Sequence, residues 1–212
     1  MIWIGDNEMS ANRRRNLGAL RERLGLPVEL VTRESLPRWV LPDHPLHPAW
    51  EHLSLVHQSD YLRAYLMHHH GGGYCDLKEP AGSWERAFDH MAANEDIWIT
   101  GYRELSSASP VRLPGRLGVD IALNYRRLIG LGAYLTRSAT PLTAEWLREV
   151  ERRMSYYADQ ASEFPGGTRG EVVGYPVSWT RLLGGVLQPL QLKYLRHVRI
   201  DDSLLLRFVD YQ

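Results

Sequence analysis

Residues 59–78 of the chain read SDYLRAYLMHHHGGGYCDLK. Leucines recur at helical spacing before the histidines, which predicts an amphipathic helix that runs up to them. The glycines at 71–73 end this helix, because glycine readily adopts the backbone conformations found beyond a helix C-terminus. Tyr74, Cys75 and Asp76 then form the end of a short strand. Ligands bind outside the carboxyl ends of strands in open α/β sheets, so the stretch predicts that Asp76 lies at a ligand-binding cleft.

Two charged residues of the predicted helix accompany Asp76. Asp60 and Arg63 are three positions apart and therefore share a helix face. The glycines that follow let the backbone approach a ligand without obstruction by a Cβ atom. We therefore expect Asp60, Arg63 and Asp76 to surround one cleft. The alternative for Asp60 and Arg63 is a surface pair worth only about 0.2–0.5 kcal/mol.

The rest of the chain alternates between strand-like and helical segments. Strands over 1–5 and 27–32, with a helix over 11–24 that Ser10 caps and Gly25 ends, form a βαβ pattern that predicts parallel pairing. Further strands are expected over 96–100, 129–136 and 204–209, and further helices from Pro48 to the histidines, after Ser83, over 143–154 and over 178–187. This order predicts an α/β fold with a central mixed, mostly parallel sheet flanked by helices, in one domain over 1–212.

Composition excludes several classes of protein. The 25 basic and 25 acidic residues give a formal net charge of zero, which argues against a nucleic-acid partner. The single cysteine, Cys75, excludes an internal disulfide and suits a reducing compartment. No apolar run approaches the roughly 20 residues that a transmembrane helix needs. We expect a cytoplasmic protein without a transmembrane segment.

The stretch at 59–78 resembles the sugar-nucleotide segment of GT-A glycosyltransferases of the DXD-containing, capsular-polysaccharide type. In these enzymes, and in the glucosyltransferase domains of large clostridial toxins, a Ser-Asp-x-x-Arg helix leads into Gly-Gly-x-Tyr-x-Asp-x-Asp. MIWIG at 1–5 is similar to their opening strand. The resemblance implies a GT-A (Rossmann-like) fold with a nucleotide-sugar donor half over 1–105 and an acceptor half over 106–212. It also implies transfer of a hexosyl or deoxyhexosyl unit, with a UDP-sugar as first candidate donor, to a saccharide hydroxyl.

The same resemblance assigns roles to individual residues. Trp3 would stack on the base and Tyr74 would line the base or ribose. Asp60 would accept hydrogen bonds from sugar hydroxyls, and Arg63 would hold the sugar or the diphosphate. Asp76 matches the first aspartate of DXD, which contacts ribose and helps to hold the metal. The remaining positions at the nucleotide-sugar site would be Gly5, Gly72 and Gly73.

Lys78 departs from the pattern, because it stands where the second DXD aspartate would be. That aspartate normally binds the Mn²⁺ or Mg²⁺ that neutralises the departing diphosphate. A protonated lysine cannot bind a metal ion and repels one. Either Lys78 is itself the phosphate partner, or it turns away and Asp76 holds the ion together with Glu79 or a histidine. The catalytic candidates are therefore Arg63, Asp76 and Lys78, with Asp76 as the metal candidate.

Two other functions remain open. Loss of the second aspartate is compatible with a module that binds a nucleotide-sugar without catalysis. The histidines at 68–70, together with Asp76, could instead build a metal-dependent hydrolase. Candidate general bases for a transferase are Asp43, Glu104 and Asp120. The loop at 33–48 and the C-terminal third are expected to shape the acceptor site.

Overall fold

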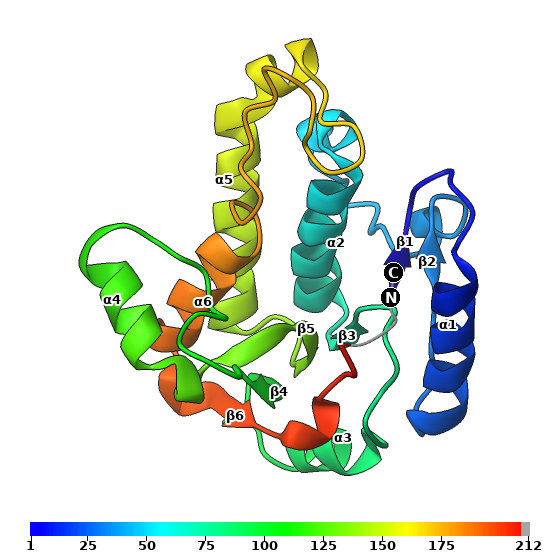
Figure 1. Ribbon diagram of the computed structural model, residues 1–212, viewed down its shortest axis with the longest axis vertical. Helices are drawn as coiled ribbons and strands as arrows, with labels where there is room; N and C mark the ends of the chain where they lie inside the picture. Colours follow the sequence, from blue (N-terminus) through cyan, green and yellow to red (C-terminus); the bar gives the residue numbers. More distant parts are fainter. Residues whose placement is uncertain (209–212) are drawn as a thin grey trace.

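The computed structural model describes residues 1–208 and has a mixed α/β architecture (Figure 1). Its helices are α1 (Ala11–Arg23), α2 (Leu55–His69), α3 (Glu85–Ala92), α4 (Gly115–Leu123), α5 (Pro141–Glu163) and α6 (Gly184–Lys193). Its strands are β1 (Ile2–Trp3), β2 (Val31–Thr32), β3 (Gly72–Cys75), β4 (Ile99–Arg103), β5 (Ile129–Thr136) and β6 (Val198–Ile200). Most of the predicted helices and strands are present, although the expected strand at 27–32 shortens to two residues, and α4 and β6 were not predicted.

The strands form two separate sheets. β1 pairs with β2 in parallel, as the βαβ pattern at the N-terminus predicts. The larger sheet has the order β3-β5-β4-β6, in which β5 runs antiparallel to both β3 and β4, and β4 runs parallel to β6. The sheet is mixed, but the expectation of mostly parallel pairing is wrong for it. Alternation of helices and strands does not fix strand direction, and β5 lies between two strands that both run opposite to it.

The two faces of the larger sheet bury different sets of helices. Tyr74 and Tyr134 point into a core with α2, α5 and α6. Cys75 and Leu135, the next residue along each strand, point into a second core with α1 and α3. This alternation is the pleat of the strands, in which successive side chains point to opposite faces. Figure 1 shows α2 beside α5 above the sheet and α3 below it.

Local signals fix most of the helix ends. The Ser10 hydroxyl accepts a hydrogen bond from the Arg13 amide and caps α1, and Gly25 follows that helix with a φ of 74°. The helix before the histidines begins at Leu55 rather than at Pro48, because Pro48–His52 forms a separate 3-10 turn and Ser54 caps α2. Ser83 lies one residue before the cap position of α3, and its hydroxyl accepts from the Glu85 amide at 3.2 Å.

Two expectations near the C-terminus are wrong. Residues 178–183 form turns, and the last helix begins only at Gly184. The expected strand at 204–209 is reduced to a single bridge between Leu206 and Pro80, and Val209 lies outside the described residues. Within residues 1–208, no helix combines the length and the apolar character needed to cross a bilayer.

Candidate functional site

A cavity of about 410 Å³ lies where β1, α2 and the end of β3 meet the segment 168–179. Trp3 reaches it from β1, Arg63 from α2 and Asp76 from the turn after β3. The sequence therefore correctly brought these three residues together. The remaining predicted site residues in its wall are Gly5, Tyr74 and Lys78.

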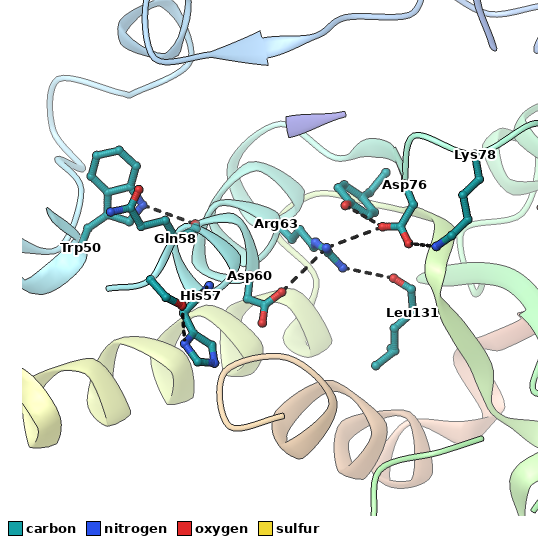
Figure 2. Close-up of polar contacts among 10 residues, drawn as sticks. Trp50, His57, Gln58, Asp60, Arg63, Asp76, Lys78 and Leu131 are labelled. Carbon is teal, nitrogen blue, oxygen red and sulfur yellow. Dashed lines mark hydrogen bonds and ion pairs between the residues drawn. The ribbon is translucent and has the colours of Figure 1, made fainter. Parts of the chain in front are cut away.

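Arg63 links the two carboxylates of the predicted constellation. Its Nη2 atom lies 3.8 Å from Asp60 Oδ1 and 3.6 Å from Asp76 Oδ1, and its Nη1 donates to the Leu131 carbonyl at 3.3 Å (Figure 2). The guanidinium carbon lies 4.1 Å from the centre of the Tyr74 ring. Burial lowers the pKa of Arg63, but Tyr74 and the two carboxylates raise it by more, so the net shift is upward. Arg63 is therefore a permanently charged, oriented cation in the cavity wall.

Both oxygens of the Asp76 carboxylate are engaged by this protein's own side chains. The Tyr74 hydroxyl donates to Oδ1 at 2.9 Å, and the Lys78 ammonium donates to Oδ2 (Figure 2). A tight turn produces the second contact, because the Lys78 amide bonds the Asp76 carbonyl at 2.7 Å. Lys78 does not turn away from the site; it lies in the cavity wall beside Asp76.

This arrangement does not fit Mn²⁺ or Mg²⁺ at Asp76. A hard divalent cation needs free carboxylate oxygens, whereas those of Asp76 already face an ammonium and a guanidinium. The ammonium of Lys78 and the guanidinium of Arg63, both beside Asp76, would repel a divalent cation bound there. Among residues 1–208, no group of three His, Cys, Asp or Glu side chains is arranged to hold a metal ion. Glu79 does not assist Asp76, because its carboxylate pairs with Arg23 and Arg207.

Asp60 does not occupy the position expected of it. Its side chain is buried and is absent from the cavity wall, with Arg63 between it and Asp76 (Figure 2). Burial raises the pKa of Asp60 to about 6, Arg63 opposes the shift and Asp76 adds to it. The i,i+3 spacing correctly placed Asp60 beside Arg63, but Asp60 supports the guanidinium from behind instead of facing a sugar.

Gly72 and Gly73 also differ from expectation. They line a different, largely apolar cavity of about 380 Å³ between the N-terminal segment and α3. A Cβ atom on Gly73 would lie 2.8 Å from Leu135 Cδ2, so close packing explains that glycine. Gly72 has a φ of 85°, in the left-handed region that favours glycine. Gly72 therefore serves the turn from α2 into β3, and Gly73 the packing of β3 against β5, rather than the site cavity. Gly5 lies in that cavity as predicted, and a Cβ there would meet Asn7 Oδ1 at 2.6 Å.

Arg13, Arg169 and Trp179 are among the residues of the cavity wall that the sequence did not predict. The Arg13 guanidinium carbon lies 5.0 Å from the centre of the Trp3 ring, and Trp3 Nε1 donates to the Asn7 carbonyl at 3.2 Å. Runs of arginine on a helix usually mark a solvated face, so Arg13 gave no distinctive signal. The described wall thus carries the basic side chains of Arg13, Arg63, Lys78 and Arg169 but one acidic side chain, Asp76. This excess of positive charge suits an anionic ligand.

The segment 164–183 covers the N-terminus of α2 and so brings Arg169 to the cavity. The Leu55 amide donates to the Gly167 carbonyl at 3.0 Å, and the Val56 amide to the Thr168 carbonyl at 3.3 Å. The Tyr175 hydroxyl accepts from the Ser54 amide at 3.1 Å and lies 2.9 Å from His57 Nδ1. These bonds satisfy backbone donors that a helix start leaves unpaired, which holds the segment in place.

The other candidates lie away from this cavity. His68 and His69 line a separate cavity with Asp43, and His70 lines the apolar one, so the histidines do not assemble with Asp76. Asp120 forms an exposed pair with Arg116. Burial raises the pKa of Glu104 to about 7, while the hydrogen bond from Gln188 opposes the shift, but Glu104 is not in the described cavity wall.

The arrangement can bind a polyanion through fixed cations and present an aromatic ring beside it. It supplies no carboxylate in the wall other than Asp76 within the described residues. In comparisons with known proteins, the chain matches no protein family, no curated protein and no solved structure.

Proposed function

We propose that the protein is a glycosyltransferase that uses a nucleoside-diphosphate sugar and meets the charge of the diphosphate with its own cations. The observation that supports this most is the convergence of Trp3, Arg63, Asp76 and Lys78 on one cavity with an excess of basic side chains. The GT-A resemblance of the 59–78 stretch supplies the reaction class. A hexosyl or deoxyhexosyl donor with UDP remains the first candidate, and a saccharide hydroxyl the acceptor.

The charges in the cavity suggest how transfer would proceed. The bond from the anomeric carbon to the diphosphate oxygen breaks, the acceptor oxygen bonds that carbon, and the acceptor's proton passes to the released diphosphate. Negative charge grows on the departing oxygen, so cations fixed beside it stabilise the transition state more than the ground state. Lys78 and Arg63 are the fixed cations, and Asp76 orients both of them. Trp3 offers a face for the base, beside Arg13.

A module that binds nucleotide-sugars without turnover is the second candidate. It is favoured by one observation: the single carboxylate in the described cavity wall is already paired with Lys78 and Arg63. An inverting transferase needs a free carboxylate as general base. The binding site is the same in both proposals, and they differ only in turnover.

One experiment separates the possibilities. UDP-, GDP-, CDP- and TDP-sugars are tested by thermal shift in EDTA and again in Mn²⁺, and release of the nucleoside diphosphate is then measured. A transferase of the proposed kind is stabilised by at least one donor in EDTA and releases its diphosphate in EDTA. Stabilisation without release supports the binding module. Stabilisation that requires Mn²⁺ contradicts the role given to Lys78, and no stabilisation by any donor contradicts both proposals.

A further inference from the structure

The short helix α4 carries apolar side chains that the protein leaves uncovered. Leu117 and Val119 are exposed, and Leu123 has 75% of its surface accessible. A single exposed leucine is ordinary, but Val119 and Leu123 on one face of a nine-residue helix form an apolar patch, whereas Leu117 lies on the side of the buried Ile121. In Figure 1, α4 lies at the edge of the molecule, on the side away from α1.

One side of α4 is fixed against the protein, which leaves the other side free. Ile121 is fully buried. A Cβ atom on Gly118 would lie 1.8 Å from the Leu113 carbonyl oxygen, so the preceding loop packs directly on the helix backbone there. Val119 and Leu123 are four positions apart and therefore adjacent on the opposite, outward face.

The segment that carries these apolar side chains is basic. Residues 112–127 contain four arginines and one aspartate, although the whole chain has a formal net charge of zero. All four arginines are exposed, and one of them, Arg116, pairs with Asp120 at 2.9 Å. Arg126 and Arg127 end the short 3-10 helix Tyr125–Arg127 that follows α4. The α4 patch consists of Val119 and Leu123 together with the exposed Arg112, Arg116, Arg126 and Arg127.

We propose that the α4 patch attaches the protein peripherally to an anionic phospholipid surface. Exposed aliphatic side chains on a short helix can enter the interface between headgroups and acyl chains, while arginines on the same surface bind lipid phosphates. A stable protein interface buries about 800 Å² on each partner, which is large for a nine-residue helix, whereas a bilayer accepts a small patch. The inference goes beyond the proposed transfer reaction and does not depend on it.

Co-sedimentation of the full chain with vesicles tests the proposal. At low salt, the protein binds vesicles of phosphatidylcholine and phosphatidylglycerol but not vesicles of phosphatidylcholine alone. Each arginine near the surface contributes about 1 kcal/mol, so Arg126→Gln with Arg127→Gln weakens binding roughly 30-fold. Leu123→Asp weakens it further by placing a charge in the interface. Val173→Asp is the matched control, since Val173 is 92% exposed elsewhere and its substitution leaves binding unchanged.

Three results would overturn the proposal: equal binding to both kinds of vesicle, no binding to either, or equal losses from Leu123→Asp and Val173→Asp. Analytical ultracentrifugation without lipid adds a fourth. If the wild-type chain self-associates and Leu123→Asp makes it monomeric, the patch is an interface between two copies of this chain. Thermal unfolding of each variant confirms that the fold is retained, which is expected because the replaced side chains are exposed.

Discussion

Replacing Lys78 by glutamine tests whether a side-chain cation has taken over the neutralisation of the diphosphate. Lys78 lies in the cavity wall and contacts Asp76 Oδ2. An ammonium about 4 Å from a phosphate oxygen contributes roughly 4 kcal/mol at an effective dielectric constant of 20. Because the ammonium also pairs with Asp76, we take about half of this interaction energy, roughly 2 kcal/mol, as the binding free energy lost on substitution. Lys78→Gln should therefore weaken pyrophosphate binding about 30-fold in EDTA.

The assay is calorimetric titration with pyrophosphate in EDTA, with two comparison variants. Lys193→Gln makes the same chemical change on an ammonium that also pairs with a carboxylate, that of Glu145, but outside the described cavity wall, so it should leave affinity unchanged. Asp76→Asn removes the one negative charge in the described wall and should strengthen binding, whereas loss of a metal ligand would weaken metal-dependent binding. The reasoning is refuted if Lys78→Gln binds pyrophosphate as tightly as Lys193→Gln does, or if Asp76→Asn binds it more weakly than the wild type in EDTA.

Three further predictions concern the groups around this site. Arg63→Met leaves two carboxylates without their shared cation and should lower the free energy of unfolding by about 3–5 kcal/mol in urea titrations, whereas Arg152→Met, at an exposed side chain, should change it far less. Burial raises the pKa of Asp60 to about 6, so the folded state binds this proton more tightly than the unfolded state and loses stability as the pH rises from about 4 to 6. Asp60→Asn cannot titrate at this position, so its free energy of unfolding relative to that of the wild type should rise by up to about 3 kcal/mol from pH 4 to pH 7. An equal difference between the two proteins at both pH values would contradict this. Tyr175→Phe removes the hydroxyl that accepts from the Ser54 amide and should speed hydrogen exchange of the Leu55 and Val56 amides, while Tyr156→Phe, at an exposed tyrosine, should not; equal exchange in the two variants would show that the hydroxyl does not hold the segment 164–183.

Short-range signals predicted many of the elements but missed α4 and β6, and they did not predict how distant strands pair. Ser10 and Gly25 bounded α1 because caps and glycine stops act within a few residues. β5 was expected over 129–136 and lies there, because a continuous apolar run marks a strand buried on both faces. Its direction depends on contacts with β3 and β4, which are far away in the sequence. The expectation of mostly parallel pairing failed for that reason.

Only part of the site was predicted, again because the sequence does not show which distant segments come into contact. Arg63 and Asp76 are joined by the end of α2, a short turn and the strand β3, so their spacing limited how far apart they could lie. Arg169 reaches the cavity only because the segment 164–183 folds back onto the start of α2. The residues next to Arg169 in the sequence do not indicate this contact. Asp60 was placed on the right helix face, but a periodicity argument does not distinguish a side chain at a cavity from one buried beneath it.

The separation of the β1–β2 ladder from the larger sheet has a consequence for the width of the cavity. Trp3 belongs to this two-stranded ladder, whereas Asp76 follows a strand of the larger sheet. No ladder of main-chain hydrogen bonds joins these two sheets within residues 1–208, so the spacing between the indole and the carboxylate is set by side-chain volumes in the layers beneath them. Leu20 and Leu24 pack in the same core as Cys75, the residue before Asp76, so a smaller side chain at either position would change how α1 packs against the larger sheet without altering a residue of the cavity wall.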